Sequence, residues 1–208
     1  MEIIPLKASI LYSSCCYLLI SGEYFSVIDP SVSYGDALRQ VPKITSMMPK
    51  YVILTHAHVD HFWEISSYTC LGMQVLVSSE DGEKLCNSVA NAAFLFPDHP
   101  SGYSGGFTVI DEGSTVDIGA DRLEVIKTPG HTSGCLCFIT DRVVFTGDTL
   151  FDFGWGRCDL PTGNAQMLFS SLERLFKLSE QLLVYPGHGS VCTIREAKFN
   201  FDYYKRNS

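Results

Sequence analysis

The chain has 208 residues, 46% of them hydrophobic and 18% charged, which excludes a largely disordered protein and favours one domain over residues 1–208. Its longest apolar run, residues 15–20, is far shorter than the roughly 18 residues of a membrane span, and Glu2 and Pro5 do not fit a secretory leader. Fifteen Lys and Arg against 23 Asp and Glu give a net charge of −8, so we expect neither a nucleic-acid nor a membrane partner.

The first half of the chain is predicted to mix strands with helices. Three short apolar runs open it, and the last two are joined by a hairpin at residues 21–23. A helical pattern ends before Pro49, and the β-branched run after it is typical of a buried strand. In chain order we expect strands at 3–6, 15–20 and 24–29, a helix at 33–48, a strand at 51–54, a helix at 62–69, a strand at 74–77 and a helix from 79 to near 96.

The second half begins with a loop at residues 97–106 that is rich in Pro, Gly and Ser, and such loops often cover active sites. After it we expect strands at 107–110, 122–127, 135–140 and 142–145, a helix at 166–178, a strand at 182–185 and a helix at 194–204. Two sheet-forming halves that both carry helices predict an α/β fold of four layers, with the two sheets packed inside and helices outside.

Eight cysteines are present, singly or within apolar runs, and no pair has the CxxC spacing. We therefore expect reduced thiols, mostly in the core, and a cytoplasmic location. Cys135 and Cys137 alternate along one predicted strand, which leaves a metal role open beside the favoured role in packing.

Histidine and aspartate residues gather where predicted strands end. Three of the six histidines and one aspartate lie within the six residues His56-Ala57-His58-Val59-Asp60-His61, directly after the strand expected at 51–54. Other members follow later strands, each beside a glycine: His131 after Gly130, Asp148 after Gly147 and His188 after Gly187. Four strand ends are therefore expected to deliver imidazoles and carboxylates to one edge of the fold.

Imidazole and carboxylate groups suit Zn, Mn or Fe at about 2.0 to 2.2 Å, and neighbouring glycines let the backbone approach such a site closely. A single histidine of this kind is more often a hydrogen-bonded core or loop residue, but seven such residues favour metal ligands and exceed the needs of one ion. Three histidines for one ion and an Asp-His-His set for another, with one carboxylate able to bridge, predict a binuclear site with open positions for water.

These motifs resemble the metallo-β-lactamase-fold hydrolases over nearly the whole chain, through H-x-H-x-D-H at 56–61 and the later His131, Asp148 and His188. The runs TGDTLF at 146–151, GWGRCDLP at 154–161 and PGHG at 186–189 are similar to the glyoxalase II-like branch. The resemblance implies an αββα sandwich and two divalent metal ions, with zinc as the expected metal and iron or manganese as alternatives. It implies that the first ion is held by His56, His58 and His131, the second by Asp60, His61 and His188, and that Asp148 bridges them.

Two features depart from the family pattern. Members often continue the first motif with Gly-Gly, whereas Phe62-Trp63-Glu64 follows His61 here, so we expect a bulkier and more acidic pocket wall at this point. Full-length glyoxalase II also carries a C-terminal helical domain that helps to bind glutathione. Only 20 residues follow His188, so we expect that domain to be lacking.

The leading hypothesis is a metal-dependent hydrolase that acts on a small-molecule thioester of the hydroxyacylglutathione type. A hydroxide that bridges the two ions would attack the acyl carbonyl, and Asp60 and Asp148 would orient it while they serve as ligands. Arg157 lies just beyond the bridging aspartate, where it either binds a substrate carboxylate or forms an ion pair with Asp159.

Other functions are compatible with the sequence to different degrees. A persulfide dioxygenase of the same fold, with one iron ion held by two histidines and one aspartate, has the same motif. A noncatalytic protein that binds metal only for its shape is disfavoured, because structural sites are coordinatively closed. Hydrolysis of β-lactams is disfavoured because no secretion signal is recognised, and nuclease activity is disfavoured by the acidic charge.

Overall fold

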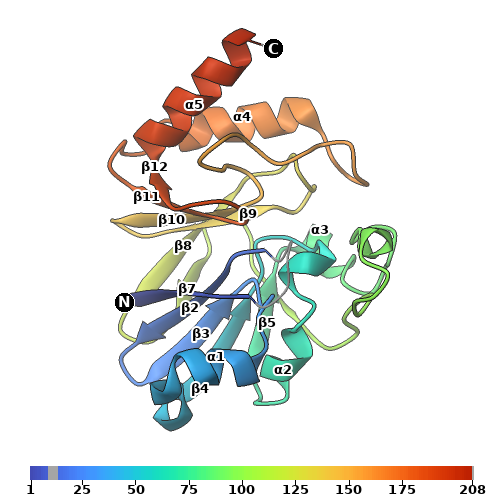
Figure 1. Cartoon of the computed structure of the whole chain (residues 1–208), viewed down its shortest axis with the longest axis vertical. Coiled ribbons are helices and arrows are strands. Elements are labelled where there is room, and N and C mark those ends of the chain that lie inside the picture. Colours follow the sequence, from blue (N-terminus) through green and yellow to red (C-terminus); the bar gives the residue numbers. More distant parts are fainter. Residues whose placement is uncertain (9–13, 208) are drawn as a thin grey trace.

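The computed structural model describes residues 1–8 and 14–207, and it confirms the predicted αββα sandwich. Two six-stranded sheets pack face to face, with α1 and α2 on one outer face and α4 and α5 on the other (Figure 1). None of the helices in these described ranges is long and apolar enough to cross a membrane.

The first sheet has the strand order β1-β2-β3-β4-β5-β6. Pairing is antiparallel from β1 to β3 and parallel from β3 to β6, so the antiparallel start expected from the hairpin changes to parallel at β4. The elements of this half are β1 (Glu2–Leu6), β2 (Cys16–Ser21), β3 (Tyr24–Ile28), α1 (Tyr34–Gln40), the 3₁₀ helix η1 (Pro42–Ser46), β4 (Met48–Ile53), η2 (Val59–His61), α2 (Ile65–Thr69), β5 (Gln74–Val77), α3 (Ser79–Gly82), η3 (Ala93–Leu95) and β6 (Thr108–Val109).

The second sheet has the order β12-β11-β10-β9-β8-β7. Its strands pair antiparallel except β10 and β11, which are parallel and are connected through α4. Its elements are β7 (Thr115–Asp117), β8 (Arg122–Lys127), β9 (Leu136–Ile139), β10 (Val143–Gly147), α4 (Ala165–Leu175), β11 (Leu183–Pro186), β12 (Cys192–Thr193) and α5 (Ile194–Asn207).

Three hydrophobic clusters fill the spaces between the four layers. In β2, Leu18 and Ile20 pack towards α1 and α2, whereas Tyr17 and Leu19 pack towards the second sheet, because alternate side chains of a strand point to opposite faces. The leucines of α4 form a third cluster with the outer face of the second sheet. Strands buried on both faces explain why the sequence carries continuous apolar runs there.

Two predicted helices are shorter than expected. The helical pattern at 33–48 is broken at Val41, whose backbone (φ −134°, ψ 73°) leaves the helical region because Pro42 follows it, and β4 already begins at Met48. The helix expected from 79 to near 96 ends at Gly82. The side chain of Asn87 accepts hydrogen bonds from two backbone amides beyond it, a local arrangement that competes with helix formation.

Several shorter features also differ from expectation. The strands β7 and β12 were not predicted, because two or three residues carry too little alternation to be recognised. All eight cysteines are free thiols, but only Cys16, Cys135 and Cys137 are fully buried, so most of them are not core residues. Neither Cys135 nor Cys137 belongs to any group of described side chains that could hold a metal ion.

Candidate metal centre

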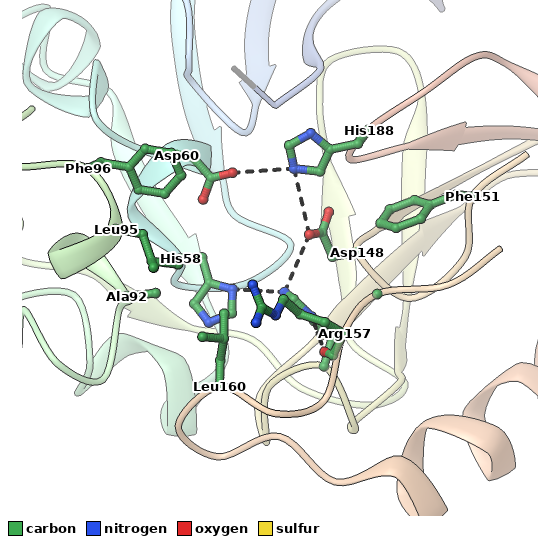
Figure 2. Close-up of a pocket in the computed structure, with 12 residues that line it drawn as sticks. His58, Asp60, Ala92, Leu95, Phe96, Asp148, Phe151, Arg157, Leu160 and His188 are labelled. Carbon is green, nitrogen blue, oxygen red and sulfur yellow. Dashed lines mark hydrogen bonds and ion pairs between the residues drawn. The ribbon is translucent and has the colours of Figure 1, made fainter. Parts of the chain in front are cut away.

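The seven predicted ligand residues converge at one edge of the sandwich. Residues 56–61 follow β4 of the first sheet, whereas the others follow β8, β10 and β11 of the second, so the centre joins both sheets. Six of the seven residues are buried, and His188 is half-buried. Figure 2 shows His58, Asp60, Asp148 and His188 pointing towards one another around a pocket.

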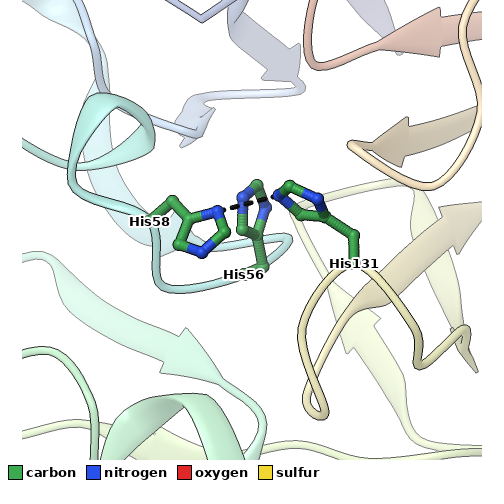
Figure 3. A group of neighbouring side chains, drawn as sticks. All are labelled: His56, His58 and His131. Carbon is green, nitrogen blue, oxygen red and sulfur yellow. Dashed lines mark hydrogen bonds between the residues drawn. The ribbon is translucent and has the colours of Figure 1, made fainter. Parts of the chain in front are cut away.

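Three imidazoles form the first group of the centre (Figure 3). The Nδ1 atom of His58 lies 2.8 Å from Nε2 of His131, and one nitrogen of each of His56, His58 and His131 lies within 4.8 Å of the others. Burial lowers the pKa of His58 to about 3 and that of His56 well below its usual value. Both side chains are therefore neutral at physiological pH, the form that can bind a metal ion.

A second group consists of Asp60, His61 and His188. Oδ2 of Asp60 lies 3.3 Å from Nε2 of His188 and 3.8 Å from Nε2 of His61. Burial alone would raise the pKa of Asp60, but the electrostatic interaction with the His61 imidazole and the hydrogen bond from His188 together outweigh it and lower the pKa. Asp60 is therefore an ionised carboxylate within reach of two imidazoles.

The Asp148 carboxylate lies between the two groups. Its Oδ1 is 3.3 Å from Nε2 of His61, and its Oδ2 is 3.4 Å from Nε2 of His131. Burial would raise the pKa of Asp148, but the imidazoles around it, His61 first, lower it well below its usual value. One ionised side chain thus faces both groups, which is the position that a bridging ligand requires.

Buried polar atoms without a partner provide a test of whether a metal ion fits. Nε2 of His56, His58 and His61 and Oδ1 of Asp148 are buried and have no hydrogen-bond partner among the described residues. A buried unpaired polar atom costs about 1–3 kcal/mol, and four in one cluster are explained if metal ions take up lone pairs there. The donor set fits divalent metal ions and is compatible with zinc, iron and manganese.

Asp29, at the end of β3, orients both groups and was missed by the sequence reasoning. Its Oδ2 accepts hydrogen bonds from Nδ1 of His61 at 2.8 Å and from Oγ1 of Thr55 at 2.6 Å. Thr55 Oγ1 lies 3.1 Å from Nδ1 of His56, from which it can accept a hydrogen bond in turn. Both imidazoles then keep the proton on Nδ1 and present the Nε2 lone pair to the centre.

The Asp29→Asn variant is expected to weaken binding at both groups about 10- to 100-fold, because an amide does not fix the two imidazole tautomers as a carboxylate does. Metal dissociation constants, measured by competition with a chelator, check this. Thr55→Val provides the matched comparison, because it removes the link to His56 alone and should weaken one ion only. Wild-type affinity for both ions in Asp29→Asn would contradict the positioning role.

A buried ion pair connects the two loops that carry the first group. Oδ2 of Asp81 accepts hydrogen bonds from the Ala57 amide at 2.9 Å and from Oγ1 of Thr132 at 2.7 Å, and these residues flank the histidines. Nζ of Lys84 pairs with Oδ1 of Asp81 at 2.7 Å and also donates to Thr162. The pair therefore fixes loops from both sheets relative to each other.

A pocket of about 340 Å³ opens over the centre. Its lining includes His58, Asp60, His131, Asp148 and His188 on the polar side, and Ala92, Leu95, Phe96, Phe151, Gly156, Arg157 and Leu160 around them. Arg157 forms two hydrogen bonds with Asp159, at 2.7 and 2.6 Å, so the ion pair weighed from the sequence is present, while its backbone carbonyl accepts from Nδ1 of His131.

The prediction that residues 62–64 form a bulky and acidic pocket wall is wrong. Phe62 and Trp63 are buried in the first hydrophobic cluster, and the wall comes instead from residues 92–96. Trp63 acts on the pocket indirectly, because its ring contacts the ring of Phe96 at a centroid distance of 5.7 Å and stacks on His99 at 4.2 Å. The residues of this pocket wall, 92–96, come before the loop at 97–106 in the chain, which was expected to cover the site.

Comparisons with known proteins agree with this geometry. The family model of the metallo-beta-lactamase superfamily matches residues 11–69 and 74–188. The hydroxyacylglutathione hydrolase GloC of Haemophilus influenzae is 30% identical over 95% of this chain and 94% of its own. The mitochondrial persulfide dioxygenase ETHE1 of Bos taurus is 31% identical over 89% of this chain and 70% of its own.

Among solved structures, TTHA1623 in a di-iron-bound form aligns with a TM-score of 0.82 and 27% identity, and the match covers 98% of this chain and 100% of that one. The fold, the paired groups of histidine and aspartate side chains and the matched sequence therefore agree. The chain belongs to the metallo-beta-lactamase superfamily, whose members are generally metal-dependent hydrolases.

Proposed function

We propose that the protein is a metal-dependent thioesterase that hydrolyses a thioester of the acyl-glutathione type at a binuclear centre. The observation that carries the proposal is the Asp148 carboxylate, which faces both a three-histidine group and an Asp-His-His group. Similarity to a hydroxyacylglutathione hydrolase over nearly the full length of both chains supports the thioester as substrate. Zinc is the proposed metal, because the donor set of imidazole and carboxylate suits it.

The ligand roles proposed for the seven residues follow their grouping. His56, His58 and His131 would hold one ion, Asp60, His61 and His188 the other, and Asp148 would lie between them. When bound, the two ions supply an activated water near neutral pH and stabilise negative charge on the acyl oxygen. Asp60 and Asp148 are ionised and would orient the activated water while they serve as ligands. A thiolate leaves readily, so the chain needs to provide no strong general acid.

Persulfide dioxygenase activity is the second candidate, because a relative of similar identity is named for it. An Asp-His-His group alone is sufficient for a mononuclear iron site with open positions. The hydrolase is favoured because the three-histidine group is also complete and buried. A mononuclear site held by two histidines and one aspartate would use only three of the seven converging residues.

Two assays on the same purified protein separate the candidates. We expect about two metal ions per chain at saturation and hydrolysis of lactoylglutathione without consumption of O₂. Metal analysis, a thiol-release assay and an oxygen electrode measure these quantities side by side. Iron-dependent O₂ uptake with glutathione persulfide, without thioester hydrolysis, would establish the second candidate instead.

Arg157 is proposed to bind the carboxylate of the thiol portion. Its pair with Asp159 is exposed on both sides, and such pairs contribute little to stability, so the guanidinium can exchange Asp159 for a substrate carboxylate. Arg157→Ala should raise KM for a glutathione thioester about fivefold with little change in kcat, since the contact is equally strong in the ground and transition states. Asp159→Asn releases Arg157 and should lower KM. Unchanged KM in both variants would contradict the assignment.

A further inference from the structure

The pocket over the metal centre has an apolar wall that the proposed chemistry does not use. Ala92, Leu95 and Phe96 lie beside Asp60 and His58, while Phe151 lies on the opposite side near Asp148 (Figure 2). The Leu95 side chain is 45% exposed and faces this pocket. An apolar group that covered the wall would therefore remove hydrophobic surface from water, both its own and that of the wall.

The wall is attached firmly to the metal-binding loop. Ala92 has a φ of 58°, which non-glycine residues rarely adopt. The buried Asn91 holds this conformation, because its Oδ1 accepts from the Ala93 amide and its Nδ2 donates to the carbonyls of Leu85 and Ser101. The Asn91 carbonyl accepts from the amide of Val59, within the H-x-H-x-D-H motif. The wall is thus held in place before a ligand arrives, which lowers the entropy lost on binding.

The wall has no charged side chain that could pair with a polar substituent. Arg157 is the only cationic residue among the described residues that line the pocket, apart from the histidines, and its guanidinium is paired with Asp159. A hydroxyl or charged group pressed against Leu95 and Phe96 would lose its water without gaining a partner. An aliphatic or aromatic group has no such penalty.

We propose that Ala92, Leu95 and Phe96 form an acyl subsite that selects thioesters with an apolar acyl group, a straight aliphatic chain or a ring, over short or hydroxylated acyl groups. The inference rests on the proposed thioesterase function and adds the chemistry of the acyl portion. The acyl carbons and the sulfur are both bonded to the carbonyl that must lie at the metal centre, but only an apolar acyl portion matches the wall, because the thiol portion carries charged groups. The polar thiol portion then extends towards Arg157 and solvent.

A series of glutathione thioesters tests the proposal on the zinc-loaded protein. With acetyl, butyryl, hexanoyl and octanoyl groups, kcat/KM should rise about threefold per methylene until the wall is covered. Propanoyl should be preferred over lactoyl, which differs from it by one hydroxyl. A flat or falling series, or a preference for lactoyl, overturns the proposal. The proposal is also overturned if kcat/KM rises in the same way when the thiol portion is lengthened and the acyl group is held constant.

Substitutions locate the subsite. Leu95→Ala should lower kcat/KM for the octanoyl thioester about fivefold and reduce the gain per methylene. Leu95→Met keeps an apolar side chain of similar size, so it should retain most of the wild-type kcat/KM. Phe94→Ala is the matched control, because Phe94 is adjacent and 55% exposed but is not among the pocket-lining residues. It should leave the whole series unchanged. Equal losses in Leu95→Ala and Phe94→Ala overturn the assignment of the wall.

Binding of the carboxylate products keeps this test separate from the thioesterase proposal. Dissociation constants of acetate, butyrate, hexanoate and octanoate for the zinc-loaded protein, measured by calorimetry, should decrease with chain length in the wild type and less so in Leu95→Ala. If no thioester is cleaved, the proposed function fails, and the carboxylate series still decides the subsite. If thioesters are cleaved but neither series depends on chain length, only the subsite fails.

Discussion

The Asp148→Ala variant is expected to lose about a thousandfold or more in kcat and to retain at most one metal ion per chain. The reason is the position of one carboxylate between two groups: Oδ1 lies 3.3 Å from His61, and Oδ2 lies 3.4 Å from His131. Without this negative charge, five imidazoles remain around the centre with only Asp60 to balance the charge of the ions. Metal content by elemental analysis and steady-state hydrolysis measure both effects.

Two comparisons make the result specific to the bridge. Asp148→Asn keeps the size of the side chain but removes the charge, so it should resemble Asp148→Ala in rate and metal content. Asp141→Ala removes an exposed carboxylate just before the first residue of β10, at the strand end away from Asp148. It should change neither the rate nor the metal content. Full metal content and activity in purified Asp148→Ala would show that Asp148 does not have the assigned role.

The position of Asp148 and its partners could be predicted from local sequence, because each follows an apolar strand, and His131, Asp148 and His188 also follow a glycine. The run after β4 and the positions after β8, β10 and β11 repeat one local rule, and parallel or mixed sheets bring such ends together. The four-layer fold followed from the same strands. The ligand positions and the strands could be predicted because both depend on residues that are close together in the chain.

Asp29 could not be recognised in the same way. It also follows an apolar strand, but a proline comes after it rather than a glycine-histidine pair. Its role depends on the pairing of β3 with β4, which places it beside Thr55 and His61, 26 and 32 residues further along the chain. A sequence pattern does not give that pairing. An aspartate at a strand end was the available signal.

The pocket wall was misplaced for a related reason. Phe62 and Trp63 are bulky, but both side chains are buried in the core, and Trp63 reaches the pocket only through the ring of Phe96, which is more than thirty residues away. The helix expected to run to residue 96 concealed the left-handed Ala92 and the hydrogen bonds of Asn91. Side-chain hydrogen bonds to nearby backbone outweighed helical periodicity in this segment.

The Gly187→Ala variant is expected to lose the second metal ion and at least a hundredfold in kcat, although it adds a single methyl group. A Cβ atom at this position would lie 2.2 Å from Oδ1 of Asp148 and 2.8 Å from Cε1 of His61, and 2.9 Å from the carbonyl carbon of Gly147. The backbone cannot move away easily, because the Gly187 amide donates to the Gly147 carbonyl at 2.8 Å and its carbonyl accepts from Cys15 at 2.7 Å. The side chains of the ligands must move instead.

Thermal unfolding with and without zinc separates this effect from general destabilisation. Overpacking costs about 1–3 kcal/mol, so metal-free Gly187→Ala should be only moderately less stable than metal-free wild type, but it should lose most of the stabilisation that zinc provides by mass action. Gly119→Ala is the matched control: a Cβ there would lie 2.2 Å from the Ser21 carbonyl oxygen, equally crowded but in the turn between β7 and β8. That variant should be destabilised and still respond fully to zinc. A Gly187→Ala protein with the same zinc response as Gly119→Ala would mean that Asp148 and His61 accommodate the methyl group without leaving the positions that a metal ion requires.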